Sequence, residues 1–125
     1  IVGPGDLVIG ISQSGETADT LAAMRLARSR GASVLAVTNI MGSQATRDAD
    51  GVLFTRSGLE IGVAATKTFV AQVAAMYLLG LRMAELRGTL APDRLAELVV
   101  GLKRIPHCIE ELLANVDAGH PGILP

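Results

Sequence analysis

The chain has 125 residues, a net charge of −1 and a pI near 6.1, which is enough for one hydrophobic core and gives no basic surface to hold a nucleic acid. Half of the residues are hydrophobic, so a disordered chain is excluded. The single cysteine, Cys108, excludes an internal disulfide and is typical of a reducing compartment such as the cytoplasm.

The first half of the chain alternates strand and helix patterns. Short, continuous apolar runs predict strands buried on both faces over residues 6–11, 33–38 and 51–55. Helices are predicted over 17–30, which Gly31 ends, and over 43–48. Because the links are short, we expect an α/β fold with a parallel sheet and right-handed crossovers. The core-facing side chains expected on the first helix are Leu21, Met24, Leu26 and Ala27.

Two longer helices are predicted in the second half. One covers residues 65–87 and ends at Gly88. The other begins at Pro92 and continues to about residue 115, with Pro106 as a kink or break.

The apolar segment 63–84 is the candidate membrane span of this sequence. Its uninterrupted apolar part covers only 69–81, whereas a span needs about 20 residues. We therefore predict no membrane span but a buried helix, which packs on the sheet on one side and on a neighbouring helix or subunit on the other.

The polar loop after the first strand is the main candidate site. Ser12, Ser14 and Thr17 supply three hydroxyls and Gln13 an amide, next to the start of a helix. The N-terminus of a helix favours an anion, and Gly15 lets the backbone approach a ligand closely. No Lys or Arg lies in the loop, which favours a small phosphate monoester over a triphosphate. The alternative is ordinary helix capping by Ser14 or Thr17.

Other polar residues carry weaker signals. Asn39 and Ser43 flank a turn and are expected to cap the short helix. Glu60 and Lys67 could act as acid–base groups, but an ion pair or solvated charges are the favoured interpretation. The pair His107–Cys108 is not expected to bind a metal, because adjacent helical side chains diverge.

Three motifs together resemble the sugar isomerase (SIS) domain family. They are ISQSGETADT over 11–20, VTN over 37–39 with GS at 42–43, and EIGVAATKTF over 60–69. Within this family they are most similar to the isomerase domains of glutamine–fructose-6-phosphate aminotransferases. The resemblance implies a three-layer α/β/α sandwich of flavodoxin-like type, with a parallel sheet.

The resemblance also implies where the domain lies in the chain and what accompanies it. Residues 1–118 would form part of the first of two SIS subdomains, apparently incomplete at both ends, and 119–125 an irregular tail. A second SIS subdomain and a glutaminase domain would carry the catalytic residues, so none is assigned in this chain. The enzyme would be a homo-oligomer without a cofactor.

The resemblance further assigns binding roles for fructose 6-phosphate or glucosamine 6-phosphate. Ser12, Ser14 and Thr17 would bind the phosphate through hydroxyls and backbone N–H groups, with Gln13 sharing in the contact. Val63 would contact the amino or hydroxyl end of the sugar through its backbone. The family commonly has Ser where this chain has Ala65, so a hydroxyl contact there would be lost.

Two other functions stay open at this point. One is a sugar-phosphate-sensing SIS module joined to a DNA-binding domain, and the other is a related SIS isomerase or deglycase. The EIGVAATK segment argues against both, and a glutaminase sequence upstream would exclude the regulator.

Overall fold

The computed structural model describes residues 1–62 and 64–117. The chain divides into two compact units, Ile1–Gly80 and Leu81–Pro125. The tail predicted over 119–125 lies outside the described residues, and the predicted boundary of the subdomain at residue 118 stays a prediction.

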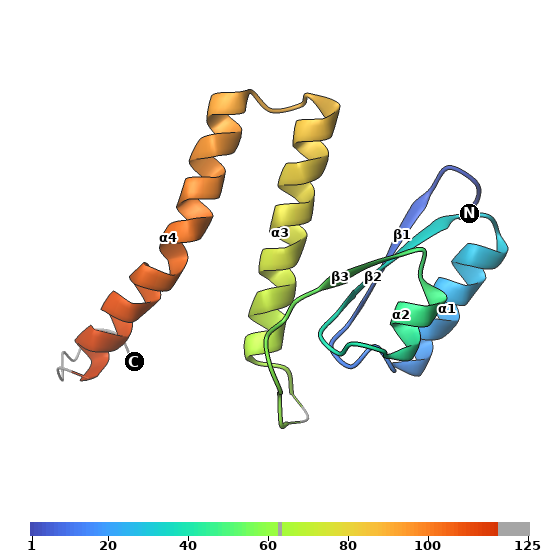
Figure 1. The fold of residues 1–125 in the computed structure, drawn as a ribbon, viewed down its shortest axis with the longest axis horizontal. Helices are drawn as coiled ribbons and strands as arrows, with labels where there is room; N and C mark the ends of the chain where they lie inside the picture. Colours follow the sequence, from blue (N-terminus) through green and yellow to red (C-terminus); the bar gives the residue numbers. More distant parts are fainter. Residues whose placement is uncertain (63, 118–125) are drawn as a thin grey trace. The chain divides into compact units, whose positions relative to one another are not determined.

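Strands and helices alternate in the first unit, as the sequence predicts (Figure 1). Their bounds differ from the predicted ones by a residue or two, since Ser12 still belongs to the first strand. The elements in chain order are β1 (Leu7–Ser12), α1 (Ala18–Ser29), β2 (Ser33–Thr38), α2 (Gln44–Asp48) and β3 (Gly51–Phe54), followed by α3 (Lys67–Arg87) and α4 (Pro92–Asp117).

The sheet is parallel, with the strand order β1-β2-β3. Ser12 at the end of β1 lies opposite Thr38 at the end of β2, and Thr38 lies opposite Phe54 at the end of β3. The three loops that follow these strands therefore leave the sheet at one edge. In open parallel sheets this carboxyl edge is where ligands bind.

Helices α1 and α2 cover one face of the sheet and form the core with it. Met24 of α1 is 1% exposed and lies over Gly10 of β1, where an added Cβ atom would collide with the Met24 sulfur. Leu26 is 53% exposed, so its predicted place in the core is wrong. The buried core residues are Leu21, Met24, Ala27, Ala32, Val34, Ala36 and Ala45.

The other face of the sheet is only partly covered. Leu7 and Ile11 are 48% and 42% exposed, so the prediction that β1 is buried on both faces is wrong. The physical reason is that β1 is an edge strand whose alternate side chains point away from α1. An apolar hollow of about 550 Å³ separates Ile11 from the first half of α3, and its α3 lining residues are Phe69, Gln72, Val73, Met76 and Tyr77.

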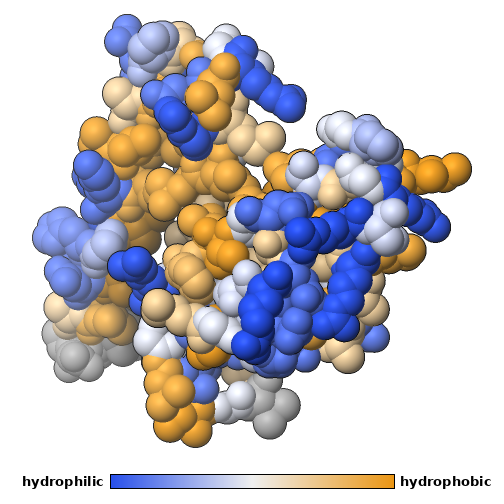
Figure 2. Space-filling view, turned by 45° about the vertical axis from the view of Figure 1, so that its right-hand side comes forward, coloured by the Kyte–Doolittle hydropathy of each residue, from blue (hydrophilic) through white to orange (hydrophobic). Residues whose placement is uncertain are grey.

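Helix α3 is largely exposed, which corrects the prediction of a buried helix. Only Thr68, Ala75 and Leu81 on it are buried. Hydrophobic residues, orange in Figure 2, lie at the surface of the long helices. By length and composition α3 could cross a membrane, and 11% of its apolar window is buried. The sheet can cover only one side of a helix that is apolar almost all round.

The sequence predicts a kink or a break at Pro106. Helix α4 continues through this residue, so the break is wrong. A proline removes one backbone hydrogen bond, and the flanking turns retain theirs. His107 is exposed on α4, with its ring nitrogens 3.9 Å from Glu110 and 3.3 Å from Glu111. Cys108 is also exposed.

The contact between Gly10 and Met24 predicts a non-additive pair of substitutions. Gly10→Ala should lower the free energy of unfolding by about 1–3 kcal/mol through overpacking, and Met24→Ala by about 2–5 kcal/mol through a cavity. In the double variant the new methyl group occupies part of that cavity, so Gly10→Ala should cost less there. Urea unfolding of the four proteins measures this coupling, and additive losses would contradict it.

Candidate functional site

The loop after β1 is closed by its own side chains. Ser12 is 7% exposed, and its Oγ accepts a hydrogen bond from the Gly15 N–H at 3.0 Å. The same Oγ lies 2.8 Å from Thr17 Oγ1, so the two hydroxyls are hydrogen-bonded across the loop. The Ser12 side chain therefore fixes the conformation of the loop through hydrogen bonds to Gly15 and Thr17.

The segment between β2 and α2 holds this loop from the other side. The Asn39 N–H and the Thr38 hydroxyl both donate to the Gln13 carbonyl, at 3.1 and 3.3 Å. The Ala45 N–H donates to the Gly15 carbonyl at 2.9 Å. These bonds engage two carbonyl oxygens that would otherwise repel an anion.

Gly15 is the closest point between the two segments. Its φ is +67°, which favours glycine. A Cβ atom at this position would overlap Ser43 Oγ and would lie 2.9 Å from Thr38 Oγ1. No side chain fits here without moving Ser43, which is buried.

The short helix α2 is capped by a residue from the β1 loop. Glu16 Oε1 accepts a hydrogen bond from the Gln44 N–H at 2.6 Å. Ser43 occupies the N-cap position without a side-chain capping bond, and Asn39 bonds elsewhere, so the predicted caps are wrong. The Glu16 carboxylate is thus bound to α2, although it belongs to the loop predicted to hold an anion.

Asn39 connects the loops that follow β2 and β3. Its Oδ1 accepts hydrogen bonds from the Ser57 N–H at 2.8 Å and the Thr55 hydroxyl at 3.1 Å, and its Nδ2 donates to the Gly58 carbonyl at 2.7 Å. Arg56, between the first two partners, has a φ of +52°. The side chain of Asn39 thereby fixes the start of the β3 loop.

Glu60 holds the end of the β3 loop against the start of α3. Its Oε1 accepts from the Thr66 N–H at 2.9 Å and the Thr66 hydroxyl at 2.7 Å, and its Oε2 accepts from the Thr68 hydroxyl. The bonds from Thr66, followed by that from Thr68 and the Lys67 charge, hold the pKa of the Glu60 carboxyl below its usual value.

The sequence favours an ion pair or solvated charges for Glu60 and Lys67, and among the described residues the two side chains form no ion pair, although their hydrogen bonds are exposed. The Lys67 ammonium donates to the Leu59 carbonyl at 2.6 Å, and the Glu60 carboxylate is held by threonines. Lys67 contributes only its charge to the Glu60 environment.

These loops enclose a hollow of about 260 Å³ at the carboxyl edge of the sheet. Three of the five predicted site residues line it, namely Gln13, Ser14 and Thr17. Ser12 lies behind the loop, and Val63 lies outside the described residues. The other lining residues, Glu60, Gly62 and Ala65, come from the segment between β3 and α3.

The capping alternative for the loop hydroxyls is not supported by their geometry. Thr17 stands at the N-cap of α1, but its side chain makes no capping hydrogen bond. Ser14 Oγ accepts from the Glu16 N–H at 3.2 Å, ahead of the helix. Both residues therefore line the hollow without capping α1.

The position of Glu60 on the same hollow as the β1 loop was not predicted from the sequence. Its signal was the spacing to Thr66 and Thr68, which allows one carboxylate to hold the first turn of α3. The charge of Lys67 is the more conspicuous partner in the sequence, but the hydroxyls of the two threonines are the ones that bind the carboxylate.

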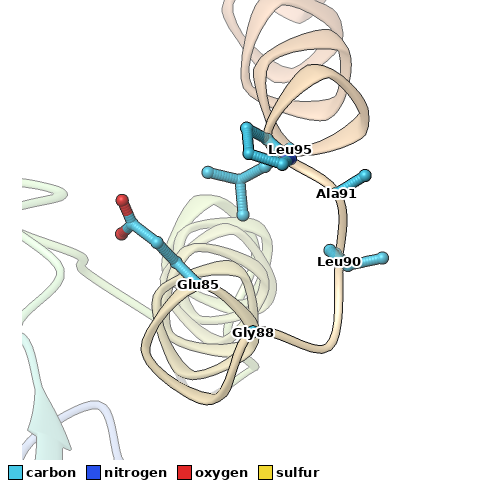
Figure 3. A pocket seen from close by; sticks show the side chains of 6 residues that line it. Glu85, Gly88, Leu90, Ala91 and Leu95 are labelled. Carbon is cyan, nitrogen blue, oxygen red and sulfur yellow. The ribbon is translucent and has the colours of Figure 1, made fainter.

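A further hollow, of about 410 Å³, lies in the second unit (Figure 3). It is lined by the turn that joins α3 to α4, with Leu90 and Ala91 on the turn and Leu95 on α4. Its one carboxylate, Glu85, is paired with Arg82 at 2.5 Å. The residues that the structure describes contain no group of three His, Cys, Asp or Glu placed to bind a metal.

Comparison with known proteins gives concordant matches. Residues 1–82 match the model of the SIS domain. Glutamine–fructose-6-phosphate aminotransferase (isomerizing) of Mycolicibacterium smegmatis is 57% identical over 112 residues, which are 90% of this chain and 18% of that protein. The enzyme of the same name from Methanosarcina acetivorans is 47% identical over 118 residues, covering 94% of this chain and 19% of the relative.

A solved structure agrees with the sequence matches. The C-terminal domain of glucosamine-fructose-6-phosphate aminotransferase from Francisella tularensis superposes with a TM-score of 0.86 at 34% identity, covering 92% of this chain and 33% of that one. The chain thus spans about a fifth of the length of the curated relatives it matches.

The close approach at Gly15 predicts that an alanine here lowers the free energy of unfolding by more than backbone strain alone would. Gly42 provides a matched control, since its φ is +75° but no atom lies within 4 Å of the position that an added Cβ would take. Gly42→Ala should lower the free energy of unfolding by about 1–2 kcal/mol from backbone strain. Gly15→Ala should exceed this by about 1–3 kcal/mol because of the collision with Ser43. Equal losses in urea unfolding would show that the collision does not occur.

Proposed function

Because the chain belongs to the SIS domain family, we propose that the hollow beside α1 binds the phosphate group of a sugar phosphate. The observation that carries this proposal is the set of neutral donors, Gln13, Ser14 and Thr17, at the N-terminus of α1. Helix N-termini attract anions, and hydroxyls donate hydrogen bonds to them. The bonding of Glu16 to α2 supports the proposal because it holds this carboxylate at the start of α2, and Glu16 is not among the residues that line the hollow.

The size and charge of the hollow favour a monosaccharide phosphate. Its volume of about 260 Å³ is below the roughly 300–1,000 Å³ of pockets for drug-sized ligands. Among the residues that the structure describes, its lining contains no Lys or Arg of the kind that nucleotide triphosphates require.

For the whole protein we propose the activity of an isomerising glutamine–fructose-6-phosphate aminotransferase. It would transfer the amide nitrogen of glutamine to fructose 6-phosphate and form glucosamine 6-phosphate. This chain would supply the phosphate end of the isomerase site, with Val63 at the sugar end. A second SIS subdomain and a glutaminase domain would supply the chemistry. The name shared by the curated relatives favours this activity over the regulator and the deglycase.

The proposed setting is a homo-oligomer in the cytoplasm, with α3 covered by protein and not by lipid. The exposed hydrophobic side chains of α3 support a protein neighbour, since large exposed apolar patches mark interaction surfaces. Soluble substrates such as sugar phosphates and glutamine are consistent with this location.

Substitution of the two pocket hydroxyls tests the phosphate site. In the protein at its full natural length, Ser14→Ala with Thr17→Ala should weaken fructose 6-phosphate binding at least tenfold, because each hydrogen bond to a charged group contributes about 1.5–3 kcal/mol. Binding of unphosphorylated fructose should not change. Isothermal titration calorimetry measures both ligands.

Ser29→Ala is the matched control for this pair. Ser29 lies at the opposite end of α1, and its hydroxyl donates to the Leu26 carbonyl at 2.8 Å. This variant should bind fructose 6-phosphate like the unsubstituted protein. Unchanged affinity in the double variant would contradict the phosphate site.

The exposed side of α3 predicts that the 125-residue chain associates with itself. Sedimentation velocity at tens of micromolar should show species larger than a monomer. Val70→Lys should weaken association, because Val70 is 60% exposed on α3. Leu59→Lys, at a 71% exposed loop position, should not. A single monomeric species would contradict the expectation.

A further inference from the structure

Glu60 places a fixed negative charge on one wall of the hollow. Its carboxylate is immobilised by three hydrogen bonds, from the Thr66 N–H, the Thr66 hydroxyl and the Thr68 hydroxyl. The Thr68 side chain is fully buried, so water does not compete for the hydrogen bond between its hydroxyl and the Glu60 carboxylate. A glutamate carboxyl is ionised at neutral pH, and the hydrogen bonds from Thr66 lower the pKa of the Glu60 carboxyl further.

The lining residues from the β1 loop have the reverse electrostatic character. They are the uncharged side chains of Gln13, Ser14 and Thr17 beside the positive end of the α1 dipole. A phosphate is therefore attracted to the α1 wall and repelled by the Glu60 wall. A ligand with a phosphate at one end and hydrogen-bond donors at the other is therefore favoured with its phosphate at the β1 loop and its donors at Glu60.

The Glu60 carboxylate has capacity for a ligand donor. An ionised carboxylate has about four acceptor positions, and three are occupied by Thr66 and Thr68. The nearby Lys67 ammonium is held by the Leu59 carbonyl at 2.6 Å, so it offsets the charge of Glu60 without forming an ion pair with it.

We infer that Glu60 is a specificity-determining residue, which orients a bound sugar phosphate and favours a ligand that carries an ammonium group over one that carries a hydroxyl in the same place. The inference rests on the proposed function. It extends that function from the phosphate to the opposite end of the ligand and assigns an amino-sugar preference to the site.

The test compares two ligands that differ in one group. Glucosamine 6-phosphate and glucose 6-phosphate differ only at carbon 2, where the first carries an amine that is largely protonated at pH 7. Their dissociation constants are measured by calorimetry on the protein at its full natural length, before and after Glu60→Gln. The preference for the amino sugar should fall about two- to fivefold, the range of a partly exposed ion pair.

The ratio of the two dissociation constants distinguishes an effect of the Glu60 charge from a general disturbance of the site. If Glu60→Gln merely displaces the wall or loosens the fold, both ligands lose affinity equally and the ratio is unchanged. Thr68→Val removes one hydroxyl that holds Glu60 but leaves the carboxylate charge, so this variant should keep the ratio. Ser14→Ala should weaken both ligands by the same factor, because both carry the phosphate.

Two results would overturn the inference. One is an unchanged ratio in Glu60→Gln, and the other is a fall in the Thr68→Val variant as large as in Glu60→Gln, which would assign the preference to loop shape. A protein that binds none of fructose 6-phosphate, glucosamine 6-phosphate and glucose 6-phosphate overturns the proposed function itself. That failure is distinct from a protein that binds all three without preference.

Discussion

The approach of Gly15 to the β2–α2 segment is the contact on which the candidate site depends. The peptide groups of Gln13 and Gly15 are bonded to the backbone of Asn39 and Ala45, with no space for a side chain between them. The register of β1 against β2 brings these segments together, because it ends both strands at the same level. The β1 loop thus directs the hydroxyls of Ser14 and Thr17 to the hollow, while its carbonyl groups at Gln13 and Gly15 are hydrogen-bonded to the β2–α2 segment.

Two carboxylates beside the hollow are used to begin helices. Glu16 accepts from the first turn of α2, and Glu60 accepts from the residues that precede and begin α3. Both carboxylates lie at positive helix ends, where a negative charge is stabilised. The difference is that Glu16 is bound away from the hollow, whereas Glu60 lines it. The asymmetry of the two walls follows from this difference.

The sequence was sufficient for the strands, the first two helices and the polar loop, because each has a local pattern. Alternation of apolar runs with Gly-containing polar turns predicts parallel strands, and hydroxyls next to a helix start predict the α1 wall. The roles of Glu16 and Asn39 were not predictable in this way, since their partners lie 28 and 16–19 positions away along the chain. The exposure of α3 was also missed, because an apolar helix has the same pattern whether or not another element covers it.

The contact of Met24 with Gly10 has a consequence for oxidative damage. In the folded protein the sulfur is shielded, since Met24 is 1% exposed, and an oxidant cannot reach it. A transiently unfolded chain exposes the thioether, and conversion to the sulfoxide adds a polar oxygen to this side chain. The space beside Gly10 is already filled by the sulfur and its neighbouring carbons, so the oxidised side chain no longer fits. A chain whose Met24 is oxidised while unfolded would therefore not regain the native packing until a reductase removes the oxygen.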